Sequence, residues 1–125
     1  MITSELVKDW LSNEGYKHEV DEDGDIRFKY QGKTFFCTSD KRDEQYFRII
    51  MPNIYQIENN RMKVLEAVNT VSRDMKVVKA FVVEDSVWLG VEMFVDSSPE
   101  VEDFMDRCLN LLQAAFERTA LEILK

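Results

Sequence analysis

The stretch from Val77 to Lys125 constrains the fold most, because it predicts a strand, a tight turn, a second strand and a long amphipathic helix. Residues 77–83 and 87–95 are rich in β-branched and aromatic side chains, which suit a pleated, half-buried surface. Every other residue of the second run is apolar: Val87, Leu89, Val91, Met93 and Val95. Because successive side chains of a strand point to opposite faces, this side of the strand is predicted to face the core.

The two strands are predicted to pair as an antiparallel hairpin, in a register that places Phe81 opposite Trp88. A loop of two residues, Glu84 and Asp85, and a loop of four, residues 83–86, put the same side chains on the same face. The four-residue loop is favoured, because a two-residue turn needs positive φ angles that Glu and Asp adopt poorly. In both registers Phe81 and Trp88 form an aromatic pair on the face turned away from the core.

A long helix is predicted to follow, with Ser98 as its N-cap and Pro99 in its first turn, where the missing N–H costs nothing. Its apolar residues recur with helical period up to the chain end: Val101, Phe104, Met105, Cys108, Leu109, Leu111, Leu112, Ala115, Phe116, Ala120 and Ile123. This stripe is wider than the ~100° that a helix needs to cover one sheet. Part of the helix surface is therefore expected to contact another chain.

The segment before Val77 predicts further strands between two helices. A first helix is predicted from Thr3 or Ser4 to about Gly15. Strands are predicted over residues 16–20, 26–30, 33–38 and 45–51, the last ended by Pro52, with residues 54–57 left open. A second helix is predicted over about residues 58–74, with an inward face of Val64, Leu65, Val68, Val71 and Met75. Residues 1–125 are thus predicted to form a single α+β domain, an antiparallel sheet with helices on one face in the order α-β-β-β-β-α-β-β-α.

The net charge narrows the classes of partner, and the cysteines indicate the cellular compartment. The net charge of −8 argues against nucleic acid, which is bound mainly through Lys and Arg, and against an anionic membrane surface. A basic or simply apolar protein partner fits this charge better. The N-terminus lacks a basic start and an apolar signal region, and the two cysteines are far apart in the sequence, so a reduced, cytoplasmic location is expected.

Three features that resemble reactive or metal-binding sites do not meet the requirements of such sites. Asp21, Asp23 and Asp25 alternate as in a calcium loop, but the sixth and twelfth positions lack the Gly and Glu that an EF-hand requires. An acidic hairpin turn is the favoured interpretation. The only histidine, His18, has no ligand neighbours at metal-binding spacing. Cys108 is predicted to be buried, and the exposure of Cys37 is left open. We therefore predict no catalytic residue, metal or cofactor, and no enzyme.

The sheet face turned away from the core is the candidate binding surface. It is expected to carry three large aromatic side chains, Phe81, Trp88 and Phe94, next to Tyr46 and Arg48. The charged side chains expected beside them are Arg27, Lys29, Lys79 and Glu92. Aromatic residues among charges on a solvent face are typical of partner surfaces. A homodimer contact and ordinary cross-strand packing remain alternatives.

Several runs of the sequence resemble the YbjN-like family, which shares the type III secretion chaperone-like fold. These runs are residues 64–71 (VLEAVNTV), residues 76–80 (KVVKA), residues 87–92 (VWLGVE) and the closing segment from Phe104 to Phe116. The resemblance spans nearly the whole chain. It implies a regulator of sensory transduction, or a small, acidic, cytoplasmic dimer that holds an extended client segment, and it supplies no catalytic residue.

Two hypotheses about function follow from these patterns. The first is a non-enzymatic protein-binding module, chaperone-like or regulatory, that holds a partner segment on its sheet surface by edge pairing or side-chain contacts. A homodimer is expected under this hypothesis. The alternative is a small-ligand sensor with a pocket between the C-terminal helix and the sheet.

Overall fold

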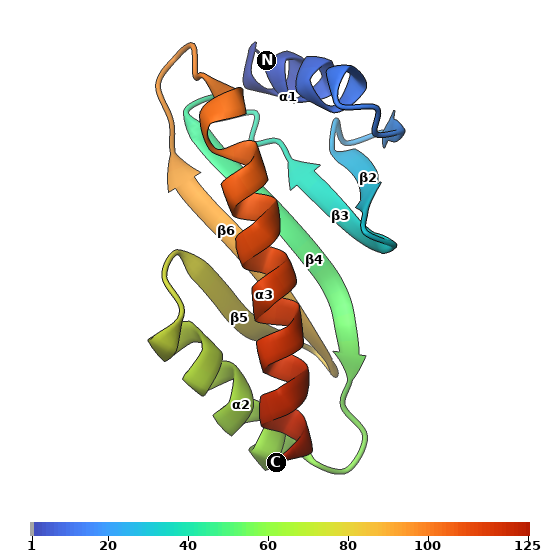
Figure 1. Ribbon diagram of the computed structural model, residues 1–125, viewed down its shortest axis with the longest axis vertical. Coiled ribbons are helices and arrows are strands. Elements are labelled where there is room, and N and C mark those ends of the chain that lie inside the picture. The colour runs from blue at the N-terminus through green and yellow to red at the C-terminus, as the bar shows by residue number, and fades with distance from the viewer. Residues whose placement is uncertain (1) are drawn as a thin grey trace.

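One antiparallel sheet forms the framework of the chain, and helices cover one of its faces (Figure 1). The computed structural model describes residues 2–125. Its elements in chain order are α1 (Ile2–Asn13), β1 (His18–Val20), β2 (Ile26–Tyr30), β3 (Lys33–Thr38), β4 (Tyr46–Gln56), α2 (Arg61–Asp74), β5 (Val78–Val83), β6 (Ser86–Phe94), the 3-10 helix η1 (Val101–Asp103) and α3 (Met105–Leu124). The α+β class and the order of helices and strands confirm the prediction, and β2 and β3 have the predicted bounds.

The sheet has six strands in the order β1-β2-β3-β4-β6-β5, with antiparallel neighbours throughout. The first four strands follow one another as a meander. Helix α2 then connects β4 to β5, and β6 returns between these two strands. Within the β5–β6 hairpin Phe81 lies opposite Trp88, as predicted.

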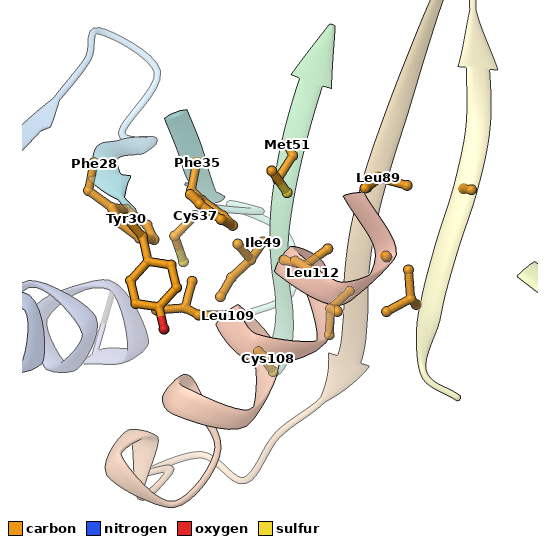
Figure 2. Close-up of a cluster of buried hydrophobic side chains, with 14 of the residues drawn as sticks. Phe28, Tyr30, Phe35, Cys37, Ile49, Met51, Leu89, Cys108, Leu109 and Leu112 are labelled. Carbon is orange, nitrogen blue, oxygen red and sulfur yellow. The ribbon is translucent and has the colours of Figure 1, made fainter. Parts of the chain in front are cut away.

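The core lies between α3 and the inner face of the sheet. In Figure 1 α3 crosses the sheet in front of β4 and β6, with α1 beyond its start and α2 beside its end. Leu109 and Leu112 of α3 are fully buried, and Figure 2 shows them in one cluster with Ile49 of β4 and Leu89 of β6. Because full burial of such an aliphatic side chain contributes about 1.5–3 kcal/mol, this contact is a main source of stability.

Strand β4 does not end at Pro52, as the sequence predicted, but continues to Gln56. Its register with β6 shifts between Met51 and Tyr55, and Pro52 falls within this irregularity. On the other side β3 pairs with β4 only as far as Ile50. Proline is tolerated at such bulges and unpaired strand sides, because no ladder hydrogen bond is lost there.

The β5–β6 hairpin has the two-residue loop, so the preference for four residues was wrong. Glu84 adopts a positive φ of 56°, and contacts from the β4–α2 connection and from the start of α2 offset the cost. Arg61 donates a hydrogen bond to the Glu84 carbonyl oxygen at 3.0 Å and forms an ion pair with Asp85. The Ile57 N–H donates to the Asp85 carbonyl oxygen at 2.7 Å. These partners are distant in sequence, so turn propensity alone could not reveal them.

The last α-helix begins at Met105, later than the predicted start at Ser98 and Pro99. Helix η1 precedes it, and Phe104 between the two has non-helical angles, with φ −130° and ψ −14°. The Phe104 ring packs edge-on against Phe47 of β4, with 5.0 Å between ring centroids. We attribute the delayed start to this tertiary contact, which the local capping pattern did not contain.

Some apolar helix residues that the sequence placed inward remain exposed. On α2, Val64, Val68 and Val71 are buried as predicted, but Leu65 is 40% exposed, and Ala67, which was not predicted to face inward, is buried. On α3, the predicted stripe residue Ala120 is exposed. The large exposed apolar side chains of these two helices are Met62, Leu65, Leu121 and Leu124.

The hairpin geometry generates a stability prediction. Replacing Glu84 by glycine should raise the free energy of unfolding by ~0.5–1 kcal/mol. The left-handed conformation costs a non-glycine residue about 1–2 kcal/mol, and the extra freedom of glycine in the unfolded chain cancels only part of this. Urea denaturation measures the effect. The control is Asp85→Gly, which removes the Arg61 ion pair and should destabilise the fold; equal losses for both variants would contradict the prediction.

The two cysteines generate a second prediction, because both are free and buried in the core shown in Figure 2. Burial raises the pKa of the Cys37 thiol to about 12 and that of Cys108 to about 11. Since the thiolate is the reactive form, neither should react with Ellman's reagent at about pH 8 in the folded protein, and both should react in urea. Rapid labelling without urea would contradict the burial.

The same pKa values predict how stability depends on pH. The thiols hold their protons more strongly in the folded state than in the unfolded chain, where the pKa is about 8.5. Their contribution to stability is therefore complete below that pKa and is lost as pH rises towards the folded values of about 11 to about 12. A Cys37→Ala/Cys108→Ala variant should lose this part of the alkaline dependence in urea titrations.

Candidate partner-binding face

The side of the sheet opposite the helices, here called the outer face, carries all five predicted site residues, with Phe81 and Trp88 near one end of β6 and Phe94 and Tyr46 at the other. Phe81, Trp88, Phe94, Tyr46 and Arg48 occupy outward positions of β4, β5 and β6, because they alternate with buried residues of the core. The other outward side chains that matter here are Arg27, Lys29, Phe36, Ile50, Lys79 and Glu92. The face as a whole therefore mixes aromatic and charged groups.

Phe36 is the outward aromatic residue that the sequence analysis did not name. It is half-buried on β3 and lies directly opposite Arg27 on one side and Ile50 on the other. The signal was present, because Phe35 and Phe36 are adjacent in a strand and one of two adjacent side chains must face outward. Phe35 is the buried member of this pair.

One row of directly opposed residues crosses all six strands on the outer face. From β1 to β5 it consists of Glu19, Arg27, Phe36, Ile50, Gly90 and Lys79. The middle of the row is apolar, and a cation stands on either side of it. Neighbouring strands lie about 4.8 Å apart, so Arg27 and Lys79 are separated by about 19 Å across the sheet.

An aromatic pair lies next to this row. The rings of Phe81 and Trp88 are tilted at 46° with 6.1 Å between centroids, and the Trp88 indole N–H donates to the Asn53 side-chain oxygen at 3.2 Å. Trp88 is only half-buried, and Phe94 at the end of β6 is 82% exposed. The aromatic surface therefore remains open to solvent in the single chain.

Glu92 contacts two polar side chains of the outer face. It accepts a hydrogen bond from the Tyr46 hydroxyl and forms an ion pair with Lys79. The Lys79 contact, and then the Tyr46 contact, hold the pKa of the Glu92 carboxyl below its usual value. Burial, followed by the Glu92 contact, raises the pKa of Tyr46. At physiological pH this cluster therefore holds an ionised carboxylate and a neutral phenol.

Arg48 lies directly opposite Glu92 and beside Tyr46, and its charge acts to lower the pKa of both groups. It forms no ion pair within the described residues 2–125, and its Nε is buried without a hydrogen-bond acceptor. A buried donor without an acceptor costs about 1–3 kcal/mol. The Arg48 guanidinium therefore lacks one hydrogen-bond acceptor, although the carboxylate of Glu92 lies nearby.

A small hollow of about 80 Å³ opens above Gly90. Ile50 and Phe81 form its apolar walls, and Arg48, Lys79 and Glu92 stand at its rim. A Cβ atom added to Gly90 would lie 3.4 Å from the Ile50 Cγ2 and 3.8 Å from the Phe81 Cε1, which is ordinary contact. The absence of a side chain at Gly90 therefore leaves room on the outer face for one small apolar group.

The other candidate sites have simpler structural roles. The oxygens of Asp21, Asp23 and Asp25 lie within 4.8 Å of one another. The Asp21 carboxylate accepts hydrogen bonds from the N–H groups of Asp23 and Asp25 at 2.9 and 3.0 Å, and Asp25 accepts one from Ser39. These bonds are those of a capped acidic turn, which agrees with the favoured interpretation. His18 Nδ1 lies 3.3 Å from the Tyr16 carbonyl oxygen.

The space between α3 and the sheet is filled by side chains. Met105, Leu109 and Leu112 are fully buried there, together with Ile49 and Leu89. The pocket that a small-ligand sensor would need at this place is therefore occupied by the core shown in Figure 2. Among the described residues, no helix combines the length and apolarity that a membrane span needs.

Comparison with solved structures shows the same fold in three proteins. An uncharacterized protein from Methanothermobacter thermautotrophicus matches with a TM-score of 0.71 at 14% identity, and the match covers 98% of this chain and 96% of that protein's chain. YbjN from E. coli has a TM-score of 0.64 at 11% identity, covering 96% and 87%. The Yersinia pestis type III secretion chaperone SycH, solved in complex with a stable fragment of YscM2, has a TM-score of 0.57 at 14% identity, covering 94% and 97%.

The family itself is shown by a sequence model rather than by these structures. A comparison with curated protein sequences found no significant match. The model of TY-Chap1, described as "T3SS (YopN, CesT) and YbjN peptide-binding chaperone 1", matches residues 3–122. This range contains every strand and nearly all of the helices, and it confirms the resemblance found in the sequence. The chain belongs to the TY-Chap1 family of peptide-binding chaperones.

Proposed function

We propose that the protein is a non-enzymatic binding module, chaperone-like or regulatory, that holds a segment of a partner protein on its outer face. The observation that carries this proposal is the open aromatic surface of Phe81, Trp88 and Phe94, bordered by Tyr46 and Arg48. Aromatic and arginine side chains of this kind dominate the energy of protein interfaces. Membership of a family of peptide-binding chaperones supports the proposal.

Side-chain contacts on the outer face explain binding better than pairing at a sheet edge. The β1 edge is only three residues long, which limits the main-chain bonds that it can offer. At the β5 edge, the Ser72 hydroxyl of α2 accepts a hydrogen bond from the Ala80 N–H at 2.8 Å and donates to its carbonyl oxygen at 3.0 Å. Ser72 thus already satisfies the groups that an added strand would use at this position.

No specific observation favours the small-ligand sensor or an enzyme. The sensor would need a cavity where Leu109 and Leu112 pack. An enzyme would need an activated nucleophile, but the pKa of each thiol is raised by burial. The proposed module acts in the cytoplasm, in keeping with its two free cysteines.

We also propose that two copies of the chain associate through the exposed apolar residues of α2 and α3. Leu121 and Leu124 are 61% and 82% exposed, and Met62 and Leu65 of α2 are 70% and 40% exposed. Isolated exposed apolar residues need no explanation, but several on two adjoining helices suit an interface. The outer face would then stay free for the partner segment.

The binding proposal is tested by affinity capture from the native cell lysate. The baits are the wild type, Trp88→Glu/Phe94→Glu on the outer face and the matched variant Leu121→Glu/Leu124→Glu on α3. Circular dichroism must first show that both variants are folded. We expect a partner that the wild type and the α3 variant retain and the outer-face variant loses.

Measurement with the purified partner must follow the capture experiment. Loss of interface hot spots costs about 2 kcal/mol or more, so the outer-face variant should bind about 30-fold more weakly. If it retains the same proteins as the wild type with the same affinity, the outer face is not the binding surface.

The association of two copies is tested by sedimentation velocity over a range of protein concentrations. The wild type and the Trp88→Glu/Phe94→Glu variant should sediment as dimers, whereas Leu121→Glu/Leu124→Glu should sediment as a monomer. The expected reason is that a buried interface disfavours charged side chains at its centre. A wild-type monomer at every concentration would rule out the proposed dimer, and a monomer from the outer-face variant alone would move the contact to the sheet.

A further inference from the structure

We propose that the segment held on the outer face is acidic, with a small apolar side chain seated over Gly90 and a carboxylate on either side of it. This inference rests on the proposed function and adds the chemistry of the partner. It runs against the net charge of the chain, which is −8 and by itself favours a basic partner. The distribution of charge on the sheet, rather than its sum, is what the partner meets.

The outward positions of the strands are positively charged. They carry the cations Arg27, Lys29, Arg48 and Lys79 and only the carboxylates Glu19 and Glu92. Further carboxylates, those of Asp23, Asp25 and Asp40, lie beyond the strand ends, in a hollow beside Tyr46 and Arg48. A segment that stays on the strands therefore meets a positive surface, and complementary charge favours an acidic one.

The two carboxylates of the face leave part of this positive charge unpaired. Glu92 is shared by Lys79 and Tyr46, and Glu19 lies 3.9 Å from Arg27 with both side chains well exposed. Pairs of this exposed kind are weak, so Arg27 remains open to a better partner. Arg48 has no ion pair in residues 2–125 and holds an unpartnered Nε.

The row across the sheet sets the spacing of the partner's side chains. Its apolar middle consists of Phe36, Ile50 and Gly90, and the hollow above Gly90 holds about 80 Å³. Arg27 and Lys79 flank this middle at a separation of about 19 Å, which an extended segment of about six residues spans at ~3.3 Å per residue. The matching segment has an apolar centre with acidic residues about six positions apart.

Single-stranded nucleic acid is the competing occupant of an aromatic and basic sheet face. Membership of a family of peptide-binding chaperones favours a peptide over an oligonucleotide on this face. We therefore favour the acidic peptide and include an oligonucleotide in the test.

The test measures fluorescence anisotropy of the full chain with synthetic probes. Three peptides of about nine residues, long enough to span the row, share a central Val-Leu pair and differ only in their flanks, which are Glu, Gln or Lys. A labelled oligothymidine is the fourth probe. The Glu peptide should bind about five- to tenfold more tightly than the Gln peptide, since each partly exposed charge pair adds modestly. The Lys peptide should bind most weakly, and raising the salt from about 0.01 M to about 1 M should remove the difference.

Substitutions measure separately how much a charged side chain and the hollow above Gly90 contribute to peptide affinity. Arg27→Gln removes the cation at one side of the row, so it should weaken the Glu peptide about three- to fivefold and leave the Gln peptide unchanged. The matched control is Lys63→Gln. Lys63 is an exposed residue of α2, so this substitution removes a positive charge from a helix rather than from the outer face and should have no effect. Gly90→Leu fills the hollow and should weaken the Glu and Gln peptides equally. Gly90→Ala adds only an ordinary contact, so it should lie between Gly90→Leu and the wild type.

Each contrary outcome has its own meaning. If the Gln or Lys peptide binds as tightly as the Glu peptide, the acidic preference is overturned while peptide binding stands. If oligothymidine binds and displaces the Glu peptide, the outer face is a nucleic-acid surface. If no peptide binds, the inference fails, and the capture experiment above decides separately whether the outer face binds any protein.

Discussion

The packing of α3 against the inner face of the sheet is the contact on which the rest of the structure depends. Met105, Leu109 and Leu112 are fully buried against β4 and β6, and the helix covers only one side of the sheet. A two-layer domain of this kind satisfies its core on one face and leaves the other to solvent. The position of α3 therefore determines which side of every strand is available for binding.

Because side chains alternate along a strand, each strand has one set of side chains in the core and the other on the outer face. Ile50 lies on the outer face yet is only 6% exposed, with Phe36 and Gly90 directly opposite it on the two neighbouring strands and Phe81 beside the same hollow. The outer face is thus neither a core nor an ordinary solvated surface. Its apolar middle is partly packed within the chain, and its cations and the rings of Trp88 and Phe94 remain reachable.

Local sequence patterns predicted the elements whose structure depends on their own residues. They gave wrong bounds or loops where residues distant in the sequence determine the structure. The alternation in β2 and β6 was sufficient to predict their bounds to within a residue and their faces. The continuation of β4 through Pro52 depends on where β3 stops pairing, and the loop at Glu84 depends on Arg61. Alternation was enough to predict the outward positions of the five candidate residues, and the adjacency of Phe35 and Phe36 held the same information for Phe36. The hollow above Gly90 is formed by side chains of three strands, so no single stretch of sequence could reveal it.

The three solved structures share the arrangement of helices and strands with this chain at only 11–14% identity. A shared framework can then present different surfaces to different segments, because the core positions and the outer positions of a strand vary independently. In this chain the outward positions carry a cation on each side of an apolar middle, although the chain as a whole is acidic. The partner's chemistry is therefore to be sought in these outward residues, since neither the fold nor the net charge specifies it.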